Sequence, residues 1–151
     1  MCSSDLVVAR IPPPAPIDDA CFSPDGALLA TACRDGSVQV RRLDSSSGVP
    51  AVWRHQGVVR RIEFSDDGST VASCGTDGKV QVRSIDGEPI CPAISLSGAA
   101  VEIAVDASGR SIFASSADGR ATLWQIENGR AIKAMEHRDP DLRRIGLAKD
   151  R

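Results

Sequence analysis

The chain has 151 residues, a hydrophobic fraction of 42% and a formal net charge of −2 at pH 7. This length suits one domain with a substantial core, and the small charge argues against general attraction to nucleic acid or to an anionic membrane. The longest apolar runs are a few residues, which excludes a membrane-spanning helix, and no secretion signal is recognised. The five cysteines form no C-x-x-C pair, so we expect reduced thiols in a cytoplasmic protein and no disulfide framework.

Three similar segments follow one another along the chain. Ten of nineteen positions are identical between "FSPDGALLATACRDGSVQV" (Phe22–Val40) and "FSDDGSTVASCGTDGKVQV" (Phe64–Val82). A third copy follows, because the dipeptides Asp35-Gly36, Asp77-Gly78 and Asp118-Gly119 are separated by 42 and 41 residues. A fixed period of this size indicates a repeat architecture.

Each unit is predicted to hold four antiparallel strands, because short apolar–polar alternations are bounded by Asp-Gly or Ser-Gly turns. No segment has an apolar stripe of helical spacing. In chain order, the first strands are 17–22, 59–64 and 100–105; the second 27–32, 69–74 and 110–115; the third 37–43, 79–85 and 120–126; and the fourth 49–54, 89–94 and 131–135.

Motifs within these units carry a family resemblance. His55 is followed by apolar residues four and seven positions later, by Phe64 nine positions later and then by "SDDG". The first copy reads "FSPDG", and in the third copy Trp124 stands six residues after Asp118. Together these motifs resemble the WD-repeat (WD40) β-propeller family, with blades of four strands, over nearly the whole chain from Ile17 to Ala148. We therefore expect an all-β incomplete propeller of about three blades and the start of a fourth.

The resemblance implies structural roles for a set of turn and tetrad positions. Blades of this family hold a hydrogen-bonded tetrad of His, Ser or Thr, Asp and Trp. The matching residues of this chain are Asp35, Asp77, Asp118, His55, Ser73 and Trp124. No copy has the complete tetrad at the family positions. We predict that His55, Ser73 and Asp77 are structural and not a nucleophilic triad, because such a triad also needs an oxyanion hole.

Two arginines occupy the tetrad's Trp position, Arg41 in the first copy and Arg83 in the second. Each guanidinium could point at the turn aspartate of its own unit, Asp35 or Asp77. The other interpretation is a solvated strand arginine, because exposed ion pairs contribute little.

The two ends differ from the repeat. "MCSSDL" resembles translated sequencing adapter, and "LRRIGLAKDR" aligns with "VRRIEFSDDG" (Val59–Gly68). Arginine also outnumbers lysine 15 to 3, which is typical of a GC-rich genome. We therefore predict a fragment of a longer bacterial protein. The predicted divisions are 1–6 non-native, 7–16 linker or remnant strand, 17–54 blade 1, 55–94 blade 2, 95–136 blade 3 and 137–151 the start of blade 4.

The function implied by the resemblance is a non-catalytic scaffold that binds a protein partner through rim loops. The matching positions are Arg34, Thr76, Asp18 and Arg60. No Gly-rich phosphate loop or metal-ligand spacing occurs, so no catalytic, cofactor or metal residue is predicted. Sparse aromatic residues argue against nucleic acid as a partner. Homo-association could complete the ring. The alternative is a regulatory region of a larger signalling enzyme, a Ser/Thr protein kinase or a nucleotide-binding ATPase.

Overall fold

The computed structural model describes residues 15–44, 50–128 and 130–138. In this part of the chain it forms twelve strands and no helix, and hence no helix that could cross a membrane. The strands are β1 (Ile17–Phe22), β2 (Leu28–Cys33), β3 (Ser37–Arg42), β4 (Ala51–Arg54), β5 (Val59–Phe64), β6 (Thr70–Gly75), β7 (Lys79–Ser84), β8 (Ile94–Ser95), β9 (Ala100–Val105), β10 (Ser111–Ser116), β11 (Arg120–Glu127) and β12 (Arg130–Arg138).

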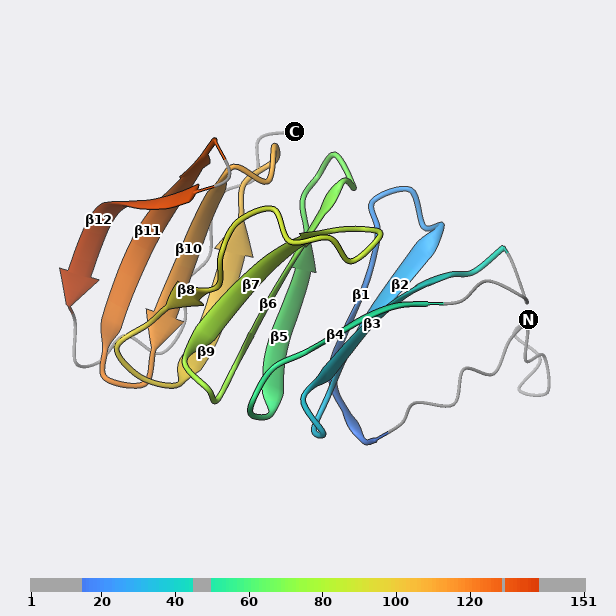
Figure 1. The fold of residues 1–151 in the computed structure, drawn as a ribbon, viewed down its shortest axis with the longest axis horizontal. Helices are drawn as coiled ribbons and strands as arrows, with labels where there is room; N and C mark the ends of the chain where they lie inside the picture. The colour runs from blue at the N-terminus through green and yellow to red at the C-terminus, as the bar shows by residue number, and fades with distance from the viewer. Residues whose placement is uncertain (1–14, 45–49, 129, 139–151) are drawn as a thin grey trace, which may run out of the picture.

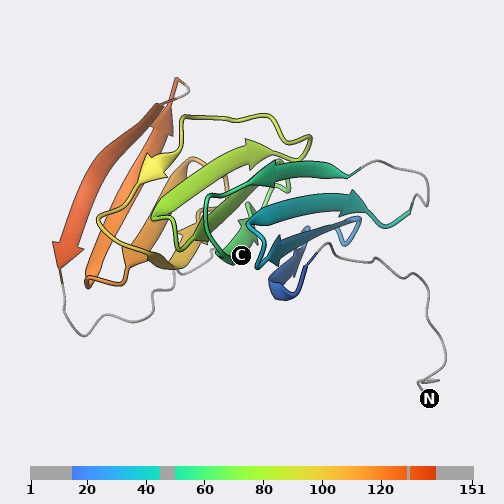
Figure 2. The same ribbon diagram turned by 60° about the horizontal axis from the view of Figure 1, so that its bottom comes forward.

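The strands form three separate antiparallel sheets of four strands each, β1 to β4, β5 to β8 and β9 to β12, which we call blades 1, 2 and 3. Each strand pairs with its neighbour in sequence. The blades lie face to face in chain order and form an open arc (Figures 1 and 2). The first strands, β1, β5 and β9, are neighbours along one side of this arc. This arrangement confirms the predicted all-β incomplete propeller.

The first strand of every blade runs over the residues that the sequence predicts, whereas the last strand differs. In blade 2 it is reduced to β8, Ile94–Ser95, where 89–94 was predicted. Pro89 and Pro92 explain the difference, because proline has no backbone N–H to donate to a ladder. In blade 3 the last strand is longer, since β12 continues to Arg138. The predicted adapter and most of the predicted linker and fourth unit lie outside the described residues.

The core consists of two apolar layers, one between each pair of neighbouring blades. Between blades 1 and 2 the buried side chains are Leu28, Ala30, Ala32, Val38, Val40, Trp53, Val59, Ile62, Phe64 and Val71. Between blades 2 and 3 they include Ala72, Cys74, Val80, Val82, Cys91, Ile94, Ala100, Ile103, Val105, Ile112, Ala114 and Ile126. Blade 2 therefore buries both of its faces, and the stability of each blade depends on its neighbour.

Candidate functional site

A buried polar network joins blades 1 and 2. His55 leaves β4 on the way to blade 2 and lies against two side chains of that blade. Its Nε2 is 2.9 Å from the Ser73 hydroxyl, and its Nδ1 is 3.1 Å from a carboxylate oxygen of Asp77. Asp77 sits in the turn between β6 and β7, where it also accepts the backbone N–H groups of Gln56 and Lys79. The structure thus brings together three residues that the sequence placed in one unit.

The fourth member of this network is Trp53, which the sequence reasoning missed. The indole Nε1 donates to the Ser73 hydroxyl at 3.1 Å. The family's Trp position of this copy holds Arg83, as the sequence shows, and the tryptophan that reaches Ser73 comes instead from β4 of the preceding blade. A signal was present in the sequence, because Trp53 and His55 are two residues apart and alternate strand residues point to the same face.

Arg83 follows neither of the two interpretations of the sequence. Its guanidinium lies over the Trp53 ring, 5.6 Å from the ring centroid. It also donates to the Gln81 side chain at 3.0 and 3.1 Å and to the Gly87 carbonyl at 2.8 Å. Arg83 is thus neither paired with Asp77 nor a purely solvated strand arginine. In blade 1 the Nε of Arg41 is buried and has no hydrogen-bond partner within the described part of the chain.

The electrostatics of the network favour a neutral imidazole. Burial lowers the pKa of His55, and the carboxylate of Asp77 offsets only part of that effect. A neutral ring that donates from Nδ1 to Asp77 can accept the Ser73 proton at Nε2, and the Ser73 oxygen then accepts the Trp53 proton. In this order the indole N–H of Trp53, the hydroxyl of Ser73 and both ring nitrogens of His55 each have a hydrogen-bond partner.

The other two turn aspartates have different partners. In blade 1 the Asp35 carboxylate accepts both the backbone N–H and the hydroxyl of Ser37, and these hydrogen bonds lower its pKa. In blade 3 the Ser116 hydroxyl donates to Asp118, and hydrogen bonds from Ser116 and Ser97 lower the pKa of Asp118 to about 2. All three aspartates accept the backbone N–H two residues on, as expected for turn residues.

The predicted partner-binding residues lie on one rim of the arc, beside the turns that hold these aspartates. Arg34 and Asp18 form an ion pair at 2.7 Å, and the Arg34 side chain is 65% exposed. Arg60 is exposed. Thr76 is used locally, because its hydroxyl accepts the backbone N–H of Val58 at 2.9 Å. Arg34 and Arg60 are thus exposed to a partner, whereas the Asp18 carboxylate is paired and only 14% exposed, and the Thr76 hydroxyl is already engaged.

Comparisons with known proteins agree with this geometry. Residues 20–103, more than half of the chain, match the profile described as the anaphase-promoting complex subunit 4 WD40 domain. The chain belongs to this WD40 family. A search of curated proteins finds no match.

Solved WD40 structures share the fold of this WD40 chain at low identity. "Structure of U3-55K" and "Crystal structure of RRP9 WD40 repeats" each superpose with a TM-score of 0.70 at 16% sequence identity. Each match covers 81% of this chain and 39% of the solved chain. The chain therefore spans about two fifths of the length of these structures, and the likeness shows the fold.

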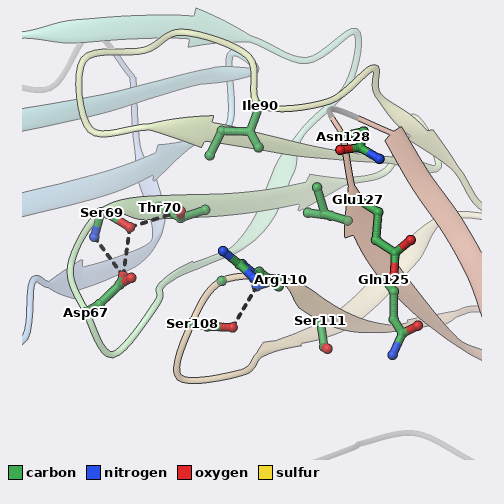
Figure 3. A pocket seen from close by; sticks show the side chains of 12 residues that line it. Asp67, Ser69, Thr70, Ile90, Ser108, Arg110, Ser111, Gln125, Glu127 and Asn128 are labelled. Carbon is green, nitrogen blue, oxygen red and sulfur yellow. Dashed lines mark hydrogen bonds between the residues drawn. The ribbon is translucent and has the colours of Figure 1, made fainter.

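The opposite rim of the WD40 arc holds a polar groove of about 810 Å³ between blades 2 and 3, which the sequence did not predict (Figure 3). Arg110 and Glu127 line it, together with Asp67. The Asp67 carboxylate accepts the hydroxyls of Ser65 and Ser69, which lower its pKa. These contacts lie within the turn between β5 and β6, so they explain the turn and identify no ligand.

Proposed function

We propose that this WD40 domain is a non-catalytic scaffold that binds a protein partner through the rim bearing Asp18, Arg34 and Arg60. The observation that carries the proposal is a contrast between the copies. The turns and buried faces repeat, whereas the rim position of Arg34 holds Thr76 and then Ala117. Positions that differ between copies of one frame suit recognition, because the same frame accommodates Arg, Thr or Ala there. The exposed arginines favour carboxylates on the partner.

The non-catalytic part of this proposal rests on the surroundings of Ser73. His55, Ser73 and Asp77 have the connectivity of a nucleophilic triad. However, Ser73 has 0% of its surface exposed, and its oxygen already accepts the Trp53 indole. A nucleophile must reach its substrate, so we assign the three residues to blade stacking. Esterase turnover that is lost on Ser73→Ala would contradict this assignment.

We further propose a cytoplasmic location. The predicted blade boundaries at 94 and 136 fall inside β8 and β12, so blade 2 extends to Ser95 and blade 3 to Arg138. The thiols of Cys33, Cys74 and Cys91 are buried and form no disulfide. Burial raises the pKa of Cys74 to about 12, which keeps that thiol protonated and unreactive. Such thiols suit a reducing compartment.

The rim proposal is tested by site-specific photo-crosslinking. A photoreactive amino acid is placed at position 34 or 60, with Glu88 on the opposite rim as the matched exposed control. We expect one protein to be captured from positions 34 and 60 and not from position 88. The purified partner should then bind the double variant Arg34→Glu/Arg60→Glu about tenfold more weakly, with the unfolding midpoint unchanged. Equal affinity for the variant and the unmodified chain would refute the proposal.

A further inference from the structure

The last strands of the three blades lie on the outer side of the arc, opposite the side where the first strands are neighbours. Each of them ends its sheet and is therefore paired on one side only, as Figure 1 shows for β12. Their lengths differ, because β4 has four residues, β8 has two and β12 has nine. An edge strand presents a row of unpaired N–H and C=O groups, and β12 has the longest such row in the described part of the chain.

The sequence protects the edges of blades 1 and 2 more strongly than the edge of blade 3. Pro50 precedes β4, and Pro89 and Pro92 precede β8. Proline and short strands are devices that prevent an edge from pairing with another chain. The β12 segment, "RAIKAMEHR", contains no proline. A register shift divides it into two paired stretches, 130–133 and 135–138. Each of these stretches is as long as the whole of β4, so β12 keeps room for a partner strand.

A groove of about 400 Å³ opens beside the first half of β12. It lies between blades 2 and 3, where the short β8 leaves Trp124 only half-buried. This volume is within the range of ligand pockets, about 300–1,000 Å³, and suits one or two apolar side chains. The apolar residues that line the groove are Pro92, Ala93, Ile94, Trp124 and Ala131.

The charge of β12 favours one kind of partner. Its sequence holds three cations, Arg130, Lys133 and Arg138, and one carboxylate, Glu136. Glu136 is already paired with Lys133, and it also lies 3.6 Å from Arg120. Arg130 lines the groove, is exposed and forms no ion pair among the described residues. Like charges that face each other destabilise a strand pair, so a second β12 is disfavoured and an acidic strand is favoured.

We propose that the outer edge of β12 is a docking site for an acidic β-strand of a partner protein. The partner strand pairs with β12 through its backbone, places a carboxylate beside Arg130 and inserts an apolar side chain into the groove at Trp124. This edge lies on the outer side of the arc, so the stacking of one blade on another does not use it. The proposal goes beyond the rim function and does not depend on it.

The probe is a capped peptide of alternating glutamate and valine, "EVEVEVE", which forms a strand with one acidic and one apolar face. It is titrated into the full 151-residue chain labelled with ¹⁵N. We expect saturable NMR shifts in β11 and β12, and nuclear Overhauser contacts between the peptide backbone and β12. The basic peptide "KVKVKVK" should bind about tenfold more weakly, because it meets the cations of β12 with like charge. Equal binding of the two peptides would overturn the proposal.

Two further versions of the acidic peptide test the strand pairing itself. One is N-methylated at every valine and the other at the internal glutamates. A strand uses the N–H groups of alternate residues to pair with one neighbour, so methylation should abolish the binding of one version and spare the other. Equal affinities of the two versions would show that the peptide does not add to β12 as a strand.

Variants of the chain supply the third arm of the test. Arg130→Glu should weaken binding of the acidic peptide about tenfold. The matched control is Arg42→Glu, at an exposed cation that ends β3, and it should leave the affinity unchanged. Ala131→Trp, which fills the groove, should weaken binding about fivefold. The rim variant Arg34→Glu/Arg60→Glu should bind the peptide normally, which separates this site from the rim.

Two other results would refute the proposal. One is the absence of saturable shifts in a chain whose circular dichroism shows it to be folded. The other is a dimeric mass in which the β12 amides are protected from hydrogen exchange without any peptide, since the edge would then pair with a second copy.

Discussion

The two interfaces between blades fill equivalent positions with opposite chemistry. Between blades 1 and 2, Trp53, His55 and Ser73 form a polar chain, and Arg83 covers the indole. Between blades 2 and 3 the equivalent positions are apolar or aromatic. The equivalents, in the same order, are Ile94, Leu96, Ala114 and Trp124, as the strand registers and the backbone hydrogen bonds of His55 and Leu96 show.

This comparison teaches that an interface needs one large ring, whichever blade provides it. The ring comes from β4 of the preceding blade at the first interface and from β11 of the following blade at the second. His55 and Ser73 are both present at the first interface, and both are replaced by apolar residues at the second. Replacing only one of them would leave a buried polar group without a hydrogen-bond partner. The indole Nε1 of Trp124 is the exception, because it is buried and has no acceptor among the described residues.

Removing the tryptophan ring at each interface should give the largest difference in unfolding free energy between the two interfaces. Trp53→Ala should cost about 3–5 kcal/mol of unfolding free energy, because the side chain is 4% exposed and its loss leaves a cavity. Trp124→Ala should cost under about 2 kcal/mol, because Trp124 is only half-buried and lines an open groove of about 400 Å³. Urea denaturation followed by circular dichroism measures both values. Equal losses of unfolding free energy in the two variants would mean that the polar network around Trp53 contributes no additional stability.

Ser73→Ala tests the centre of the polar chain. It removes the hydroxyl that links the Trp53 indole to the His55 ring, so the unfolding free energy should fall by about 1–3 kcal/mol. The double variant Ser73→Ala/His55→Leu, which copies the second interface, should recover part of this loss. A double variant less stable than the sum of the single changes would contradict the view that these partners form one unit.

The pH dependence of stability should distinguish the two interfaces through His55. Burial lowers its pKa below 6.5, so the unfolded chain binds the proton first as the pH falls. The contribution of neutral His55 to the unfolding free energy is therefore fully present above about pH 6.5. It is lost progressively on acidification, until the pH reaches the lower pKa of His55 in the folded state. Thermal unfolding at pH 7.5 and 5.5 measures the change. His55→Gln should remove this dependence and His137→Gln, at an exposed site, should retain it; the reverse result would exclude His55 as its source.

The smallest expected effect is an increase in the unfolding free energy, on substitution of Ala114. Ala114 lies on the same face as Trp124, diagonally across β10 and β11. Ala114→Ser would offer the buried indole N–H an acceptor and should raise the unfolding free energy by up to about 1 kcal/mol. Ala104→Ser, a buried position on the other face of blade 3, is the matched control and should lower it. A loss at both positions would show that Trp124 does not need an acceptor.

Local features of the fold were predictable because they depend on neighbouring residues. The Asp-Gly turns require a positive φ that glycine adopts freely, and Gly36 has φ 88°. A Cβ there would also lie 2.6 Å from the His55 carbonyl oxygen. The shortened β8 follows from Pro89 and Pro92, which the strand prediction did not weigh.

By itself, the sequence determined the repeat, the strand order and the turn aspartates, because periodicity and turn chemistry act within a few residues. Only the tertiary structure decided which tryptophan binds Ser73, since Trp53 of blade 1 reaches this hydroxyl from the neighbouring sheet. The same holds for burial. Phe22 and Phe64 occupy equivalent positions in their units, but one is exposed and the other buried. A strand specifies which side chains share a face, and the neighbouring sheet decides whether that face meets water.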